Sequence, residues 1–229
     1  RYGIAVDASI GALIELNTVS NGQDHGIALT DSVSGATVRN NESFSNFHPV
    51  VRQANGIYLN RSFNNRIEGN RLHHNQDSGL QQNSDSHHNI AIQNISWSNG
   101  DHGYDNLNSS SSTFIGCVAW KNYKDGFSIE GSSSGAKVYN CIGVDNGINV
   151  LPADGTLEPN LWVDAQSSVG FESNYNMWWN STSLAPIKYI NTWYSTINAF
   201  STATGHDWQS LQLNPLFVDP ANGIFELQP

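Results

Sequence analysis

The chain has 229 residues, of which 38% are hydrophobic, 10% aromatic and 13% charged, and its formal net charge is −10. The aromatic content and low charge exclude a disordered chain, and the acidic excess makes nucleic acid and anionic membranes poor partners. No apolar run approaches the roughly eighteen residues that a membrane span requires. The sequence opens at Arg1, inside a repeat, without methionine or signal peptide. We therefore expect a processed or truncated chain, secreted or at the cell surface, as a monomer or part of a larger protein.

A repeat with a period near 23 residues runs through the first two thirds of the chain. Asparagine recurs at spacings of 25, 29, 24, 23 and 24 residues, at Asn21, Asn46, Asn75, Asn99, Asn122 and Asn146. A row five residues earlier reads Leu16, Asn41, Asn70, Asn94, Cys117 and Cys141. A bulky row two residues earlier reads Val19, Phe44, His73, Trp97, Trp120 and Val144. Glycine opens a short alternating segment in each repeat, at Gly3, Gly26, Gly56, Gly79, Gly103 and Gly126.

This repeat predicts an all-β fold, a single-stranded right-handed parallel β-helix, or solenoid, with coils of about 23 residues and an asparagine ladder. Three short strands fit each repeat, and no coil can bury its apolar face without its neighbours. Equivalent residues then stack about 4.8 Å apart, and asparagine tolerates the left-handed conformation of tight corners. A β-sandwich also contains short strands, but its strands do not keep residue identity at a constant period.

We predict regular coils over residues 1–150, and irregular coils with a capping segment of the same domain over 151–229. The long spacing between Asn46 and Asn75 holds an insertion, residues 48–54, which we expect to loop out from a corner. The final segment, NPLFVDPANGIFELQP, is expected to cover the open end of the stack. We expect Trp97 and Trp120 to stack in the core, and Cys117 and Cys141 to lie buried and unbonded on adjacent coils.

The alternation within the glycine-led segments predicts one polar outer face, which would suit an extended sugar chain. Its first row reads Ala5, Ala28, Tyr58, Gln81, Asp105 and Ser128. Its second row reads Asp7, Thr30, Asn60, Asn83, either Leu107 or Asn106, and Glu130. The predicted substrate-binding residues are Gln81, Asn83, Asn60 and Arg52, the last from the insertion overhanging the face.

The densest group of chemical side chains on this face comprises Asp77, Asp101, His102, Asp105, Lys124, Asp125 and Glu130. Three stacked coils carry them, so they should lie within roughly 10–12 Å of one another. Carboxylates at such short distances repel one another unless a cation lies among them. Several carboxylate oxygens in one place favour Ca²⁺. We predict a Ca²⁺ site formed by Asp101, Asp105, Asp125 and Glu130. Ordinary turn residues before glycine are the alternative interpretation.

Three residues are candidates for proton transfer. His102 could act as a general base, and Lys124 could act as a base or bind a substrate carboxylate. Tyr58 points outward and could act as an acid or as a platform on which a sugar stacks. Tyr104 directly follows its glycine and is expected to point into the core.

The segments NRLHHNQDSGLQ, FIGCVAWKNYKDGFSIEG and CIGVDNGIN resemble the coils of the family-nine polysaccharide lyases, the β-helical pectate lyases. The resemblance implies Ca²⁺ held by aspartates and a lysine base. The reaction would be β-elimination, in which the C5 proton of a uronate is removed and the O4 bond breaks. The family's Asp-Asp-Gly-Phe-Asp pattern falls on residues 124–128, where Asp125 is retained. The segment from His102 to Asp105 is also similar to the His-Gly-Phe-Asn motif of mannuronan C5-epimerases.

The functional expectation is a polysaccharide lyase that cleaves a pectate-like or alginate-like uronan on the polar face. An acidic polysaccharide would then be its partner. A uronan epimerase shares the C5 chemistry, and a glycoside hydrolase could use Asp101 with Asp125 as its carboxylate pair. A non-catalytic carbohydrate-binding or structural module is a further alternative, because the fold alone does not determine function.

Overall fold

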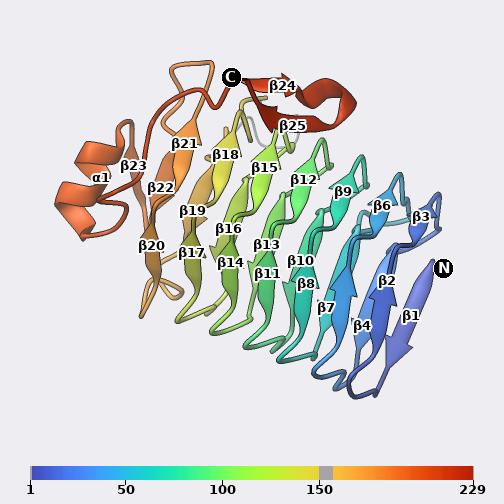
Figure 1. The fold of residues 1–229 in the computed structure, drawn as a ribbon. Coiled ribbons are helices and arrows are strands. Elements are labelled where there is room, and N and C mark those ends of the chain that lie inside the picture. Colours follow the sequence, from blue (N-terminus) through green and yellow to red (C-terminus); the bar gives the residue numbers. More distant parts are fainter. Residues whose placement is uncertain (1, 150–156, 229) are drawn as a thin grey trace.

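A computed structural model describes residues 2–149 and 157–228. Three sheets run along the axis of an elongated stack, from β1 at one end to α1 at the other (Figure 1). Three successive strands, one in each sheet, make one coil, so the predicted parallel β-helix is confirmed. None of the described helices is long and apolar enough to cross a membrane.

The first sheet, sheet A, carries the polar face. Its first eight strands are parallel, and the last one pairs antiparallel. In order they are β1 (Ile4–Asp7), β4 (Ile27–Thr30), β7 (Ile57–Asn60), β10 (Leu80–Asn83), β13 (Tyr104–Leu107), β16 (Phe127–Glu130), β19 (Leu161–Val163), β22 (Ile187–Tyr189) and β23 (Thr192–Tyr194).

The other two long sheets are parallel throughout. Sheet B contains β2 (Leu13–Glu15), β5 (Thr37–Arg39), β8 (Arg66–Glu68), β11 (Ile90–Ile92), β14 (Thr113–Ile115), β17 (Lys137–Tyr139) and β20 (Glu172–Asn174). Sheet C contains β3 (Thr18–Ser20), β6 (Glu42–Phe44), β9 (Arg71–His73), β12 (Ile95–Trp97), β15 (Val118–Trp120), β18 (Ile142–Val144) and β21 (Met177–Trp179). Parallel pairing therefore continues past residue 150, through β19 to β22.

The main core is the line of inward side chains between the three sheets. From sheet A it receives, coil by coil, Ile27, Ile57, Leu80, Tyr104, Phe127, Leu161 and Ile187, all fully buried. Tyr104 points inward as expected, and its hydroxyl donates to the backbone oxygen of Asn94 at 2.7 Å. Cys117 and Cys141 are buried free thiols on neighbouring coils, which confirms that expectation.

An asparagine ladder follows sheet C, but it begins one coil later than predicted. The Nδ2 of each member donates to the Oδ1 of the next over 2.8–3.0 Å, through Asn46, Asn75, Asn99, Asn122, Asn146 and Asn160. Asn21 is exposed and lies outside the ladder, because Gly22 is the residue whose N–H donates to Asn46. The pairing of β3 with β6 accounts for the one-residue difference.

The same register corrects the row five residues earlier. It begins at Asn17 rather than Leu16, and its ladder runs through Asn41, Asn70 and Asn94. In the bulky row, Val19 faces inward opposite Ser43, so Ser20 is the residue that aligns with Phe44.

The bulky row of sheet C does not belong to the main core. Trp97, Trp120 and Val144 form a second apolar cluster on the outer side of that sheet. The C-terminal hairpin covers it: β24 (Phe217–Asp219) and β25 (Ile224–Leu227), joined by the 3₁₀ turn η1 (Pro220–Asn222). Phe225 lies 5.3 Å from the ring of Trp97 and 6.1 Å from that of Trp120. The core-stack prediction was therefore wrong about the location, although both tryptophans are buried.

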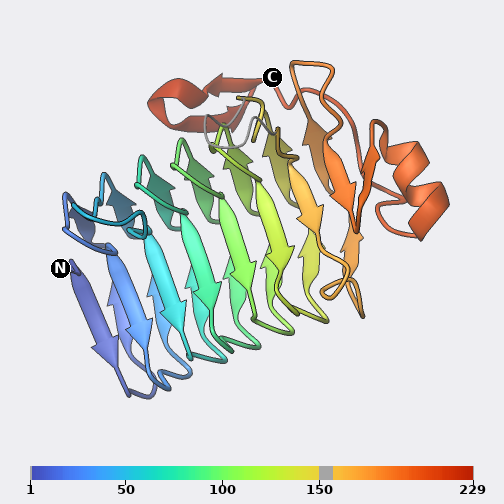
Figure 2. The ribbon, with the colours of Figure 1, turned by 180° about the vertical axis from the view of Figure 1, so that it is seen from behind.

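The prediction for the final segment was also wrong, because the hairpin lies along the side of the stack (Figure 2). The last coil is instead closed by helix α1 (Ile197–Thr204), whose Ile197 and Phe200 join the main core. Thr196 caps the helix by accepting from the N–H of Ala199, and Gly205 ends it in the left-handed conformation.

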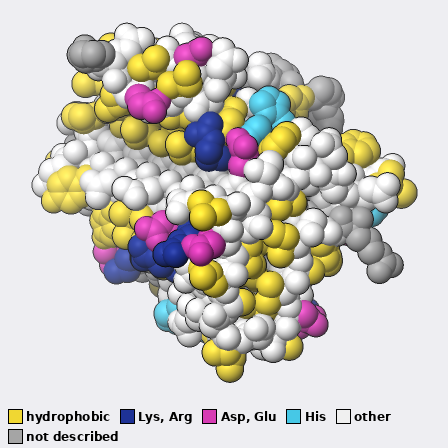
Figure 3. Space-filling model, turned by 45° about the vertical axis from the view of Figure 1, so that its right-hand side comes forward, with side chains coloured by type: hydrophobic (Ala, Val, Ile, Leu, Met, Phe, Trp, Pro, Cys, Tyr) yellow, Lys and Arg dark blue, Asp and Glu magenta, His cyan; other side chains and the backbone are white. Residues whose placement is uncertain are grey.

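On the face shown in Figure 3, charged side chains are sparse, and some of them lie in small groups of mixed sign. On sheet B, for example, Arg39 pairs with Glu15 at 2.6 Å and Arg66 pairs with Glu68 at 2.7 Å. These pairs are half-exposed, so they contribute little to stability.

Candidate functional site

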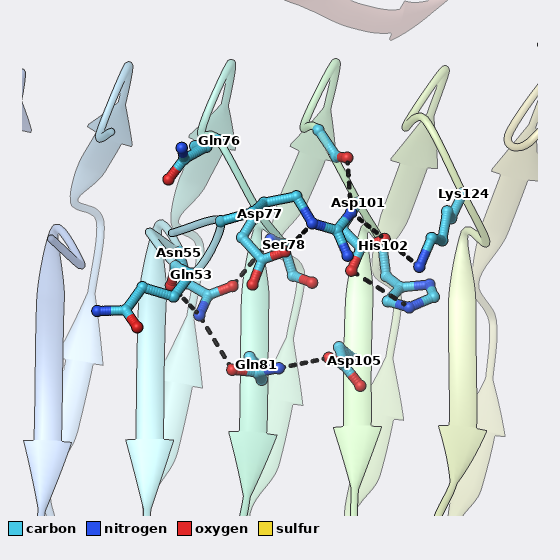
Figure 4. A network of polar contacts seen from close by, with 12 residues as sticks. Gln53, Asn55, Gln76, Asp77, Ser78, Gln81, Asp101, His102, Asp105 and Lys124 are labelled. Carbon is cyan, nitrogen blue, oxygen red and sulfur yellow. Dashed lines mark hydrogen bonds and ion pairs between the residues drawn. The ribbon is translucent and has the colours of Figure 1, made fainter. Parts of the chain in front are cut away.

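The site lies where the chain enters β10, β13 and β16, along the edge of sheet A that is formed by the N-terminal ends of its strands (Figure 4). The residues before each glycine stack coil on coil. The N–H of Gly79 donates to the oxygen of His102, and that of Gly103 to the oxygen of Asp125. One residue earlier in each coil, the N–H of Asp101 donates to the backbone oxygen of Asp77, and the N–H of Lys124 donates to the backbone oxygen of Asp101. This backbone register brings charged side chains from three coils to one place.

The outer face has the two predicted rows. Tyr58, Gln81 and Asp105 pair in register along the first row, as do Asp105 and Ser128. In the second row, Leu107 lies opposite Glu130, which decides between the two residues left open by the sequence. Asn106 is fully buried on the inner side.

The insertion loops out at residues 48–53, as expected, and brings Arg52 over the edge of sheet A. The Nη1 of Arg52 lies 3.0 Å from Oδ1 of Asp101, and its Nε lies 3.5 Å from Oδ1 of Asp77. The Nζ of Lys124 reaches the same Asp101 oxygen at 2.9 Å. One carboxylate is therefore shared by two cations.

These charges divide the two aspartates into different protonation states. Burial alone would raise the pKa of Asp101, but the positive charges of His102, Lys124 and Arg52 lower it below its usual value. Burial, followed by repulsion from Asp101, raises the pKa of Asp77 to about 7. At neutral pH, Asp77 is thus poised between its protonated and ionised forms.

His102 lies within a ring of carboxylates. Its Nδ1 is 3.0 Å from Oδ2 of Asp125, and its Nε2 is 3.7 Å from Asp101 and 3.8 Å from Glu130. Burial would lower the pKa of His102, but these charges outweigh it and raise the pKa to about 10. The side chain is therefore an imidazolium at neutral pH.

Asp105 is the second carboxyl group poised near neutrality. It is only 4% exposed; its Oδ2 accepts from Nε2 of Gln81 at 2.6 Å, while its Oδ1 has no hydrogen-bond partner. Burial raises the pKa of Asp105 to about 7 against the opposing charge of His102. Burial likewise raises the pKa of Asp125 to about 6 and that of Glu130 above its usual value.

Lys124 is held as a cation. Burial alone would lower its pKa, but the charge of Asp101 and the hydrogen bond to it raise the pKa above the usual value. Lys124 and His102 therefore both carry protons in the free protein, whereas Asp77 and Asp105 can exchange theirs near pH 7. The residues suited to acid–base work are thus the two carboxyl groups.

The four carboxylates predicted to hold Ca²⁺ do not form a single set. Within the described part of the chain, the ligand atoms that all lie within 4.8 Å of one another come from His102, Asp105 and Glu130. Asp101 is engaged by Arg52 and Lys124, and Asp125 is engaged by His102. A protonated imidazole does not fit an oxygen-only calcium site, and its charge already offsets the carboxylates that a cation would neutralise.

The remaining predicted residues lie along the face toward the N-terminal coils. The ring of Tyr58 stacks on that of His25 at 4.0 Å, and its hydroxyl accepts from Nδ2 of Asn60 at 2.8 Å. Burial raises the pKa of Tyr58, so its hydroxyl stays protonated. Asn83 lies in the second row beside Asn60.

Sequence reasoning assigned no role to Asp77 or Asn55. Asn55 donates to Oε1 of Gln81 at 3.0 Å, and Gln81 in turn donates to Asp105, so the three side chains form a relay along the face (Figure 4). The signal was available in the sequence, because Asn55 directly precedes Gly56 and Asp77 lies two residues before Gly79, and both glycines open neighbouring strands.

Comparisons with known proteins support the architecture. A family model described as "Right handed beta helix region" matches residues 2–176, whereas no curated protein matches the sequence. The structure of pectate lyase Pel9A aligns with a TM-score of 0.62 at 16% identity, covering 99% of this chain and 60% of that one. Periplasmic alginate epimerase AlgG aligns with a TM-score of 0.65 at 21% identity, covering 93% and 46%. The chain thus spans less than two thirds of these proteins, and at such identities the likeness shows the shared fold.

Proposed function

Because the chain belongs to the right-handed β-helix family, we propose that it is a carbohydrate-active enzyme whose sheet A face holds a uronate-containing polysaccharide. The observation that carries this proposal is a pair of carboxyl groups, Asp77 and Asp105, whose pKa values lie near 7 beside three cations. Two proteins of similar fold are named for pectate and alginate. A secreted or periplasmic location belongs to the same proposal.

The reaction we assign is β-elimination. A base takes the C5 proton of a uronate, the electron pair forms the C4–C5 double bond, the C4–O4 bond breaks, and O4 receives a proton. The C5 proton is weakly acidic, so positive charge must neutralise the adjacent carboxylate. Arg52 and Lys124 are the cations at the edge of the face, and an incoming uronate would compete with Asp101 for them.

The residue roles follow from the protonation states. Ionised Asp105 is the base, and its raised pKa makes it a stronger base than an ordinary carboxylate. Protonated Asp77 is the acid that supplies O4. His102 and Lys124 carry protons, so they act here as fixed positive charges rather than as bases. Tyr58, Gln81, Asn60 and Asn83 contact the bound chain.

Glycoside hydrolysis is the second candidate, because the same two carboxyl groups favour it. A protonated Asp77 could donate to the glycosidic oxygen while an ionised carboxylate activates water. The two reactions differ in their products, since only elimination leaves an unsaturated uronate. Epimerisation would exchange the C5 proton without cleaving the chain.

The test uses polygalacturonate and alginate as substrates, with ultraviolet absorbance and new reducing ends measured in parallel. We expect both signals to rise together, and Asp105→Asn and Asp77→Asn each to lower the rate by about 10²-fold or more. Asp85→Asn is the matched control, because this exposed aspartate lies in a turn after β10 outside the cluster. Reducing ends without absorbance would replace elimination by hydrolysis. Neither signal, with binding retained, would leave epimerisation or a non-catalytic module, and exchange of the C5 proton in D₂O would distinguish these two.

A further inference from the structure

The outward row that carries Asp105 does not end at Ser128. Beyond Ser128 it continues in register to Trp162 on β19, then to Lys188 on β22, which pairs with Trp193 on β23. The polar face therefore ends, at the last strands of sheet A, in two indole rings with a lysine between them. None of these three residues has a part in the acid–base cluster.

Lys188 is held by the two rings. Its Nζ lies 5.2 Å from the ring centroid of Trp162 and 5.4 Å from that of Trp193. Both distances are within the range in which an ammonium is attracted to the face of an aromatic ring. Trp193 is 39% exposed, and Trp162 and Lys188 are partly exposed, so a ligand can reach this group.

The charge of Lys188 differs from the other cations of this face in one respect. Arg52 and Lys124 are both bound to Asp101. Lys188 makes no ion pair with any residue in the ranges 2–149 and 157–228. An acidic ligand could therefore bind Lys188 without displacing a carboxylate of the residues in those two ranges.

The position suits a neighbouring sugar of the same chain. By strand spacing, Trp162 lies two strands, or about 10 Å, from Asp105, and Lys188 lies about 14 Å away. A hollow of about 540 Å³, lined by Thr182, Ser183, Leu184 and Trp193 among others, opens beside this end of the sheet. A polysaccharide crossing the strands at the cluster would reach the two tryptophans a few rings later.

We propose that Trp162, Lys188 and Trp193 form a binding subsite for an acidic sugar ring at the C-terminal end of sheet A. The sugar ring packs on the indole surfaces that Lys188 does not cover, and the ammonium binds its carboxylate. This inference rests on the proposed function only in that the ligand is the uronan held by the cluster. It adds that the bound chain extends toward α1 and that its acidity is recognised there.

The test measures binding of oligogalacturonates of increasing length by calorimetry. Lys188→Met keeps the apolar stem but removes the charge, and it should weaken binding of long oligomers about tenfold. The shortest oligomers, which fill only the cluster, should be unaffected. Trp193→Ala should show the same dependence on length. Lys121→Met is the matched control. The Nζ of Lys121 also lies over an indole ring, 4.8 Å from the centroid of Trp120, but Trp120 belongs to sheet C rather than to sheet A.

Equal affinity of Lys188→Met and wild-type protein for every length would overturn the subsite. So would an equal loss for neutral oligosaccharides, because the carboxylate would then play no part. Circular dichroism of each variant establishes that it is folded. The proposed function fails separately: if wild-type protein never turns over the polymer but binds it in a Lys188-dependent manner, the subsite stands and the catalytic assignment does not.

Discussion

Replacing Asp105 by asparagine should stabilise the protein and inactivate it together. The pKa of Asp105 is raised from 3.8 to about 7, so the folded protein binds this proton more tightly than the unfolded chain does. The stability that this proton provides is present below about pH 4 and is lost as pH rises through 7. Asparagine cannot ionise and can still accept from Gln81, so Asp105→Asn avoids that loss.

The size of the effect follows from the pKa. A difference of about three pH units corresponds to at most about 4 kcal/mol. Urea unfolding of the variant and wild-type proteins between pH 4.5 and 8 measures it. The difference in unfolding free energy should be small at pH 4.5 and should grow in favour of the variant toward pH 8. Asp85→Asn, at an exposed position outside the cluster, is the matched control.

Two outcomes would refute this reasoning. If the variant is less stable than wild type at pH 8, ionised Asp105 is a stabilising group and its burial is not costly. If the stability difference is flat with pH, Asp105 titrates at its ordinary value and is not poised for proton transfer near neutrality. Retention of full activity by a stabilised Asp105→Asn variant would separately remove Asp105 from the acid–base role.

Three further predictions concern the ladder, the metal and the insertion. Asn99→Ala removes bonds to Asn75, Asn122 and a backbone oxygen, and should lower the unfolding free energy by about 3 kcal/mol in urea melts; Asn191→Ala, at an exposed position, should not. Calorimetry with Ca²⁺ should show no uptake, and a chelator should not change activity, because the protonated ring of His102 lies among the carboxylates. Uptake of Ca²⁺ would contradict the protonated state of His102. Arg52→Gln should raise KM for uronan more than for a methyl-esterified polymer, and an equal change would exclude carboxylate recognition by Arg52.

The fold was readable from the sequence because stacking forces equivalent residues into register. The glycines at 56, 79, 103 and 126 set that register correctly, and it located the outward rows and the charged cluster. The first coil was misaligned because Asn21 resembles a ladder residue, while the true partner of Asn46 is a glycine. Side-chain identity at one position cannot resolve a one-residue difference; backbone pairing does.

The site was predictable as a location but not as a set of roles. Sequence position brought His102, Lys124 and the aspartates together, yet their protonation depends on which charges touch. From the sequence alone Lys124 is a candidate base, but its ion pair with Asp101 raises its pKa and keeps it protonated. The position of the C-terminal hairpin over Trp97 could not be predicted from the sequence either, because nothing in this segment specifies which side of the stack it covers.

The most direct test of the central claim is proton NMR of polygalacturonate or alginate incubated with the protein in D₂O. If sheet A holds a uronan for elimination, the products carry a C4–C5 double bond at the new non-reducing end and lack the C5 proton there. Cleaved products with saturated ends and an intact C5 proton would contradict the claim, as would an unchanged polymer that the protein binds.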